Sequence, residues 1–240
     1  LTLLVSVLDT TLDSEVALFV DEKTLESAKR HSYQAGVLEG RDMAKIFAWM
    51  RPNDLIWNYW VNNYLLGNEP PVFDILFWNN DTTRLPAAFH GDLIEMFKTN
   101  PLIRANALEV CGTPIDLKKV TSDVFSLAGT NDHITPWGSC YKSARLFGGK
   151  TEFVLSSSGH IQSILNPPGN PKSRYMTNPE LPVDAKEWQE NSTKHTDSWW
   201  LYWQSWQAER SGKLKKAPSV LGNKAHPAGE AAPGTYVHER

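Results

Sequence analysis

Three short apolar segments recur along the chain and are separated by more polar stretches. Residues 1–8, 124–128 and 151–155 are rich in Val, Leu and Phe, and each is followed by turn-forming residues. Short apolar runs of this kind are typical of strands buried on both faces of a parallel sheet. Residues 139–147 predict a helix that the following glycines end. Strand, helix and strand together predict a βαβ unit with a right-handed crossover.

The stretch between the first and second apolar segments has a helical character. Asp21 and Asp42 are expected N-caps, and prolines are expected to stop or start the helices. Four helices are predicted there, over residues 21–34, 42–51, 53–66 and 86–100. The third is apolar and aromatic around most of its circumference, so it is either buried on all sides or covers a site or a partner.

The remaining segments are less regular. Phe73, Ile75 and Phe77 alternate with other residues as in a short strand. The pattern becomes irregular after His160, and a helix rich in tryptophan follows around Trp199–Trp206. From these patterns we expect four parts: a core strand (1–9), a mostly helical cap insertion (10–115), an α/β core (116–210) and an extended C-terminal tail (211–240).

Composition removes several classes of function. The 240 residues carry a net charge of −3 with no clustered basic face, so we expect no nucleic-acid partner. Two cysteines exclude a disulfide scaffold and fit a reducing cytosol. No apolar run reaches the ~18 residues of a membrane helix, and no basic region precedes Leu1, so we expect no signal peptide. Because the chain begins inside an apolar segment, we expect it to be a piece of a longer protein.

The strongest candidate for chemistry is a pair of residues after two consecutive predicted strands. Asp132 follows residues 124–128 and His160 follows residues 151–155. Parallel neighbours bring both side chains to the same edge of the sheet, and acid followed by His is the order found in α/β-hydrolases. An imidazole can take a proton from a nucleophile near neutral pH, and a carboxylate holds its tautomer. The structural alternative is an Asp that caps the following helix and a His that ends a strand.

A nucleophile is missing from this pattern, since no Gly-x-Ser-x-Gly elbow or cysteine equivalent is present. Cys111 lies too close to Asp132 to leave room for the expected βα units. Cys140 comes after the acid, although a helix start could lower the pKa of a thiol there. Both cysteines are expected to be buried or half-buried small apolar residues instead, and we expect the elbow upstream of Leu1. His133 is a candidate auxiliary base, but a purely structural histidine is favoured.

Five long motifs resemble polyhydroxyalkanoate synthases, specifically the class II, pseudomonad type that uses medium-chain monomers. They cover residues 50–60, 73–81, 132–137, 158–171 and 231–237. The resemblance implies the C-terminal part of an α/β-hydrolase fold with a helical cap insertion. It also implies a Cys-His-Asp triad in which Asp132 is the acid, His160 is the base and the Cys lies upstream, so that this chain alone is expected to be inactive.

By the same resemblance, the activity is acyl transfer from (R)-3-hydroxyacyl-CoA to a growing polyester, with release of CoA. The implied partners are that substrate, the polyester chain, a second copy bound through the cap and the surface of cytoplasmic polymer granules. Whether His160 or Asp132 activates the 3-hydroxyl group stays open. Two alternatives remain: an esterase or polyester depolymerase with a Ser elbow, and a granule-associated module without catalysis.

The other aromatic and histidine residues suggest structural roles first. Cap packing is favoured for Trp57, Tyr59, Trp60 and Tyr64, and a core position is favoured for the tryptophans of the C-terminal helix, with a polymer-surface role as the alternative. We predict no metal and no cofactor, because the remaining histidines lack ligand spacing; they are His31, His90, His195, His226 and His238.

Overall fold

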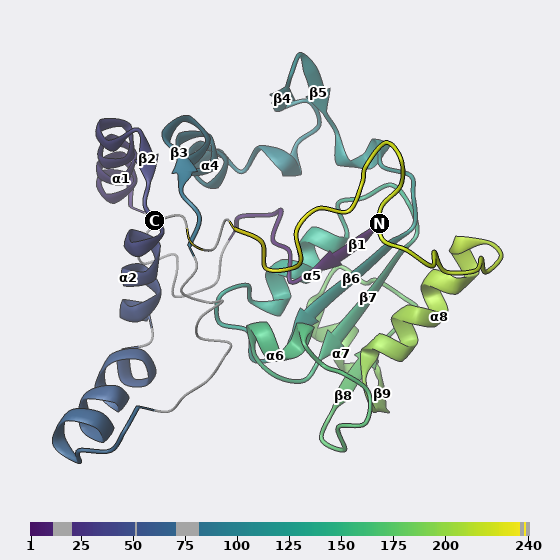
Figure 1. Ribbon diagram of the computed structural model, residues 1–240. Helices are drawn as coiled ribbons and strands as arrows, with labels where there is room; N and C mark the ends of the chain where they lie inside the picture. Colours follow the sequence, from purple (N-terminus) through teal and green to yellow (C-terminus); the bar gives the residue numbers. More distant parts are fainter. Residues whose placement is uncertain (12–20, 51, 71–81, 236–237, 239–240) are drawn as a thin grey trace.

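A five-stranded mixed sheet forms the centre of the computed structural model, which describes residues 1–11, 21–50, 52–70, 82–235 and 238 (Figure 1). The strand order is β1-β6-β7-β8-β9. β1 pairs in parallel with β6 and β6 with β7, whereas β8 and β9 continue the sheet in antiparallel fashion. The strands span Thr2–Leu4 (β1), Val124–Gly129 (β6), Thr151–Ser156 (β7), Arg174–Thr177 (β8) and Thr193–Thr196 (β9).

Alternation along β6 and β7 divides the core into two layers, one on each face of the sheet. Leu127 pairs with Val154, and both face the C-terminal helix α8 (Trp199–Ser211). Their neighbours Ala128 and Leu155 face the opposite side, toward α5 (Trp137–Ala144) and α7 (Ala185–Glu190). Every residue of β6 is buried, which explains why its sequence is a continuous run rather than an alternating one.

The three predicted strands and the helix between the second and third are confirmed as β1, β6, α5 and β7. The first strand is shorter than expected, since it stops at Leu4 and Val5 takes a left-handed conformation with φ +47°. The segment after His160 is more regular than expected. It holds α6 (His160–Ile164), α7 and the antiparallel pair β8 and β9, whose short polar sequences lack the apolar runs of the central strands.

Helices predominate between β1 and β6, and Figure 1 shows α1, α2 and α4 gathered to one side of the sheet. The predicted cap of α1 (Glu22–Ala35) is confirmed, because the Asp21 side chain accepts a hydrogen bond from the Thr24 amide at 3.1 Å. The start predicted at Asp42 is wrong: α2 spans Gly40–Met50 and holds Asp42 in its first turn. The helix predicted from Pro86 is confirmed as α4 (Ala87–Thr99), which ends at a left-handed Asn100.

Short elements complete this region. Two small antiparallel pairs join β2 (Val37–Leu38) to β3 (Leu85–Pro86) and β4 (Leu108–Val110) to β5 (Thr113–Ile115). Two 3₁₀ turns follow Asn100 and Asp116, η4 (Pro101–Ile103) and η5 (Leu117–Lys119). The strand predicted around Phe73–Phe77 lies outside the described residues. The division into a cap (10–115), a core (116–210) and a tail (211–240) stays a prediction, although residues 212–235 form no helix or named strand.

The aromatic helix predicted over residues 53–66 departs from expectation in two ways. It contains two π-helical segments, η2 (Asn53–Trp57) and η3 (Trp60–Leu65). Its aromatic side chains are exposed rather than packed, with Trp57 at 55% and Tyr64 at 71%. Trp60 and Tyr64 stack on each other at 4.3 Å between ring centroids. The interpretation of these side chains as cap packing is therefore wrong. The apolar pattern in the sequence shows only that the segment could be buried, whereas the structure shows that no described element covers it.

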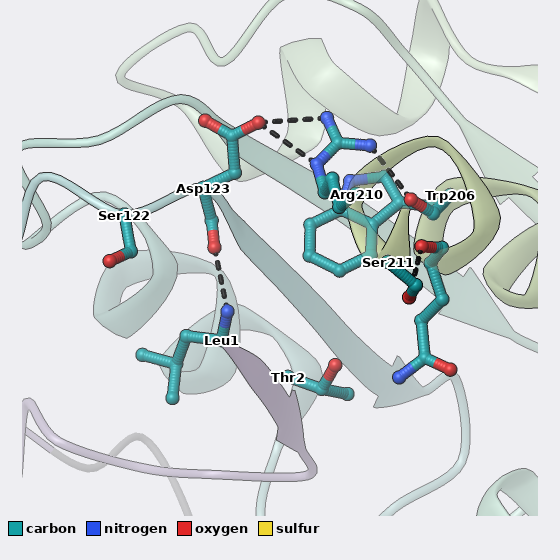
Figure 2. A pocket seen from close by; sticks show the side chains of 8 residues that line it. Leu1, Thr2, Ser122, Asp123, Trp206, Arg210 and Ser211 are labelled. Carbon is teal, nitrogen blue, oxygen red and sulfur yellow. Dashed lines mark hydrogen bonds and ion pairs between the residues drawn. The ribbon is translucent and has the colours of Figure 1, made fainter. Parts of the chain in front are cut away.

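The C-terminal helix α8 confirms the expected core role of its tryptophans. Trp199 and Trp206 are 3% and 8% exposed and pack against Phe125 of β6. At the end of the helix, Arg210 lies over the Trp206 ring at 4.2 Å and pairs with Asp123 at 2.8 Å. Figure 2 shows this end beside the start of β1 and β6, where these residues line a shallow groove.

Truncation of Trp206 should destabilise the fold through loss of this packing. We expect Trp206→Ala to lower the free energy of unfolding by about 3–5 kcal/mol, as is usual for a buried aromatic residue. Leu201→Ala removes an apolar side chain from the same helix, but at 44% exposure it should cost less than ~1 kcal/mol. Urea unfolding followed by circular dichroism measures both. Equal losses in the two variants would contradict the assignment of α8 to the core.

Candidate active site

The loops that follow β6 and β7 are held together by backbone hydrogen bonds. The Thr130 amide donates to the Ser156 carbonyl at 2.9 Å, and the Asn131 amide donates to the Ser158 carbonyl at 3.0 Å. Gly129 ends β6, and a Cβ there would lie 2.8 Å from Ser163 Oγ and 2.9 Å from the Ser158 carbonyl oxygen. The absence of a side chain at Gly129 thus lets α6 approach the end of β6 closely.

Asp132 and His160 meet at this edge of the sheet, as the sequence predicts. His160 Nδ1 lies 2.7 Å from Asp132 Oδ2. Because an ionised carboxylate only accepts hydrogen bonds, this contact requires the ring proton on Nδ1, and it leaves Nε2 of the neutral ring able to take a proton. The Asp132 side chain is fully buried, whereas the His160 side chain is 27% exposed. This is the arrangement of an acid that orients a base.

Three further hydrogen bonds fix the carboxylate. Oδ1 accepts from the amides of Ile134 and Thr135, each at 2.9 Å, and Oδ2 accepts from the Thr135 hydroxyl at 2.7 Å. The hydrogen bonds from the two amides form a turn within the loop and do not cap α5, whose N-cap is Pro136, so Asp132 shapes its own loop and also holds His160. Thr135 was missed in the sequence because a threonine three residues after an aspartate is an ordinary turn pattern.

Opposing effects set the pKa of Asp132. Burial raises it, but the hydrogen bonds from His160 and from the amide and hydroxyl of Thr135 together outweigh burial and hold the pKa below its ordinary value. The carboxylate therefore stays ionised at neutral pH, as an acid that stabilises an imidazolium must.

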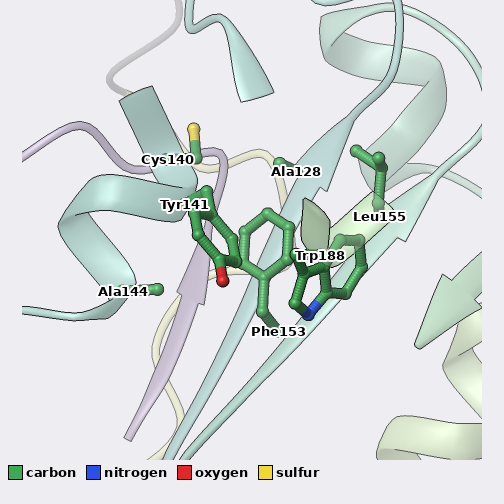
Figure 3. Close-up of a cluster of buried hydrophobic side chains, with 7 residues drawn as sticks. All are labelled: Ala128, Cys140, Tyr141, Ala144, Phe153, Leu155 and Trp188. Atoms are coloured by element: carbon green, nitrogen blue, oxygen red, sulfur yellow. The ribbon is translucent and has the colours of Figure 1, made fainter. Parts of the chain in front are cut away.

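Neither cysteine has the surroundings of a nucleophile. Cys140 is fully buried at one end of the core cluster that also contains Tyr141 and Phe153, and its sulfur points away from their rings (Figure 3). Burial, with a further contribution from the charge of Asp132, raises the pKa of its thiol to about 12. Cys111 is exposed at the two-residue turn between β4 and β5, with φ +49°. The buried position expected from the sequence is confirmed for Cys140, whereas the expectation that Cys111 is buried or half-buried is wrong, because the turn between β4 and β5 exposes it.

His133 is half-buried, and within the described part of the chain no hydrogen bond or ion pair joins it to the dyad. The described residues also contain no cluster of three His, Cys, Asp or Glu side chains able to hold a metal ion. None of the described helices is both long and apolar enough to cross a membrane.

The family model for the alpha/beta hydrolase fold matches residues 1–167. The chain belongs to this family. Its expected fold class is thereby confirmed, and a dyad of acid and His after consecutive parallel strands is consistent with it.

Curated relatives are similar over the whole chain. Poly(3-hydroxyalkanoate) polymerase 1 of Ectopseudomonas oleovorans is 81% identical over 240 residues, and polymerase 2 of the same organism is 60% identical over 239. The polymerase subunit PhaC of Cupriavidus necator is 38% identical over 242 residues, which cover 98% of this chain. The chain spans only 43% of the length of the two Ectopseudomonas relatives and 41% of the third. The resemblance to polyhydroxyalkanoate synthases noted from the motifs is confirmed.

Replacement of Asp132 should change how stability depends on pH. A carboxyl group whose pKa is lowered by folding stabilises the fold above its unfolded pKa of ~3.9, and this contribution is lost as the pH falls through the folded pKa. We expect Asp132→Asn to cost on the order of 1–3 kcal/mol at pH 7. The difference from the unmodified protein should shrink between roughly pH 5 and pH 3. Urea unfolding across this range tests the prediction, and a difference that grows on acidification would contradict it.

The two cysteines should react very differently with a thiol reagent. Only a thiolate is alkylated rapidly, and Cys140 is both buried and held protonated. We expect iodoacetamide to label Cys111 in the folded protein at pH 8 and to leave Cys140 unlabelled until urea is added. Peptide mass spectrometry gives the extent at each site, and rapid labelling of Cys140 in the folded protein would reopen its candidacy as a nucleophile.

Proposed function

We propose that this chain supplies the acid and the base of a polyester polymerase that acts on (R)-3-hydroxyacyl-CoA. The observation that carries the proposal is the 81% identity to poly(3-hydroxyalkanoate) polymerase 1 over all 240 residues, which include the Asp132–His160 dyad. Since the chain spans 43% of that relative, the nucleophilic cysteine is assigned to residues of the longer protein upstream of Leu1.

The proposed reaction has two steps. His160 takes the proton of the cysteine thiol, and the thiolate attacks the thioester carbonyl, so that the acyl group moves to the enzyme and CoA leaves with a proton. The 3-hydroxyl group of one acyl unit then attacks an acyl-enzyme thioester while its proton passes to His160 and from there to the departing cysteine sulfur. An ester bond forms, the C–S bond breaks, and the cysteine sulfur is released for the next monomer.

The geometry favours His160 as the base in both steps. The two oxygens of Asp132 already accept four hydrogen bonds, from two amides, one hydroxyl and the His160 ring. A carboxylate offers about four lone-pair sites, so no site is left for a substrate hydroxyl. Its lowered pKa also makes Asp132 a weak base. The side chain of His160 is partly exposed, and no described residue bonds its Nε2 atom, which could serve as the base.

The proposal extends to partners and place. The substrate is a CoA thioester, and the product is an insoluble polyester, so we propose action at cytoplasmic polymer granules. We also propose a homodimer formed through the helical insertion, where the exposed aromatic side chains of η2 and η3 lie. No membrane or nucleic-acid partner belongs to the proposal.

The decisive experiment follows CoA release by the full-length protein from a medium-chain (R)-3-hydroxyacyl-CoA, with a thiol reagent to detect CoA. We expect His160→Ala and Asp132→Asn each to lower turnover by about 10³-fold or more, as in other triads. The control His226→Ala changes an exposed tail histidine and should leave turnover within about twofold, the usual scale of a neutral surface change. Turnover near normal in either dyad variant would overturn the assigned roles.

Single-turnover kinetics test whether one base serves both steps. If His160 does so, Asp132→Asn slows the first release of CoA and the later elongation by similar factors, because both depend on the oriented imidazole. A variant that releases the first CoA at the normal rate but fails to elongate would instead make Asp132 the base for the hydroxyl.

Product analysis separates the polymerase from the alternative function within the same family. A hydrolase yields free 3-hydroxy acid, and the polymerase yields chloroform-soluble polyester.

A further inference from the structure

Helix α6 carries His160 as its first residue, and it is too short to hold its own geometry. It has five residues, His160–Ile164, whereas isolated helices shorter than about 12 residues are marginal in water. Its last carbonyls have no partner inside the helix and must be satisfied from elsewhere. The position of the imidazole therefore depends on what binds the end of this helix.

Two tryptophan side chains of α8 donate to the last two carbonyls of α6, and the second of these carbonyls, that of Ile164, also accepts from the Asn166 amide at 3.0 Å. The indole N–H of Trp199 donates to the Ser163 carbonyl at 2.7 Å, and the indole N–H of Trp200 donates to the Ile164 carbonyl at 2.9 Å. Trp199 is buried, and Trp200 is half-buried. Consecutive residues of one helix thus bind consecutive carbonyls of another.

The same turn of α6 is tied to the dyad. The Ser163 hydroxyl donates to the carbonyl of His160 at 2.9 Å, and Ser163 packs where any side chain at Gly129 would lie. Gly129 ends the strand that leads to Asp132. A displacement of Ser163 would therefore move the backbone of His160 relative to the carboxylate that orients its ring.

The loop after α6 has its own contacts with the start of α8. The Ser198 hydroxyl, at the N-cap of α8, donates to the Asn166 carbonyl. Asn166 is buried, and its side chain accepts from the Ser173 hydroxyl at 2.5 Å. Residues of α8 and its N-cap thus bind three carbonyls, the last two of α6 and that of Asn166, two residues beyond the helix.

We infer that α8 positions the imidazole of His160, through the indole N–H groups of Trp199 and Trp200 on the last carbonyls of α6. The two tryptophans are positioning residues, because they act through α6 and touch no reacting atom. The inference rests on the proposed function only for its kinetic consequence, since the hydrogen bond between His160 and Asp132 can be observed without turnover.

The same helix offers a matched control. Trp203 is half-buried like Trp200, but its indole N–H donates to Thr2 Oγ1 of β1 at 3.1 Å, away from α6. Trp→Phe removes one N–H donor and part of the ring at each position. Trp200→Phe and Trp203→Phe therefore remove the same groups from similarly buried positions. The first removes a hydrogen bond to α6, and the second removes a hydrogen bond to β1.

The test compares Trp199→Phe, Trp200→Phe, their double variant and Trp203→Phe in the full-length protein. We expect kcat for CoA release to fall about tenfold in each of the first two and about 100-fold in the double variant, with KM within about twofold, since a shift of 1 Å in a catalytic group can cost 10²-fold. Trp203→Phe should keep kcat within about threefold even where its melting temperature falls as much as that of Trp200→Phe. Equal loss of kcat in Trp200→Phe and Trp203→Phe would overturn the inference.

A second measurement does not depend on activity. The proton of His160 Nδ1, bound to a carboxylate, should give a resolved low-field proton NMR signal that is absent in His160→Ala. We expect this signal to shift or broaden in Trp199→Phe and Trp200→Phe and to be unchanged in Trp203→Phe. Retained turnover in His160→Ala would contradict the proposed function. The comparison of NMR signals among the tryptophan variants would still test whether α8 positions the imidazole. An unchanged signal in the double variant would refute the positioning itself.

Discussion

The parallel ladder between β6 and β7 is the constraint on which the site depends. Six consecutive residue pairs, from Val124–Thr151 to Gly129–Ser156, end both strands at the same edge of the sheet. A slip of one residue would exchange the two faces of one strand and would separate its buried residues from the layer they pack against. The burial of every residue of β6 therefore protects the register, and the register brings Asp132 and His160 to a distance of 2.7 Å.

The parts of this arrangement visible in the sequence are those encoded locally. Apolar runs with turn endings identified β1, β6 and β7, and an aspartate cap and a proline located α1 and α4. Asp132 and His160 followed from the strand order, because the ends of adjacent parallel strands must meet. β8 and β9 were missed because their stability comes from pairing with β7 and with each other rather than from an apolar pattern of their own.

Other features depend on contacts between distant residues, which no local pattern encodes. The aromatic segment in η2 and η3 has the composition of a buried helix, but its side chains are exposed because no described element packs on them. The role of Thr135 depends on the direction of one hydroxyl group. The indole contacts from α8 to α6 join residues 36 positions apart, and in the sequence the same tryptophans indicate only a core helix.

The contacts that orient Asp132 and His160 come from within this chain. Among the described residues, the hydrogen-bond donors to Asp132 are Ile134, Thr135 and His160, and α8 of the same chain donates to the last two carbonyls of α6. Hydrogen bonds already satisfy the buried carboxylate, so the dyad requires no substrate or cysteine to take its geometry. A base that is already held in its working orientation needs little reorganisation when a thiol binds. Under this condition an oriented imidazole accelerates proton transfer. The inferred positioning gives α8 a second role beside its place in the core, because a five-residue helix such as α6 is too short to hold its own geometry and the indole N–H groups of α8 bind its end.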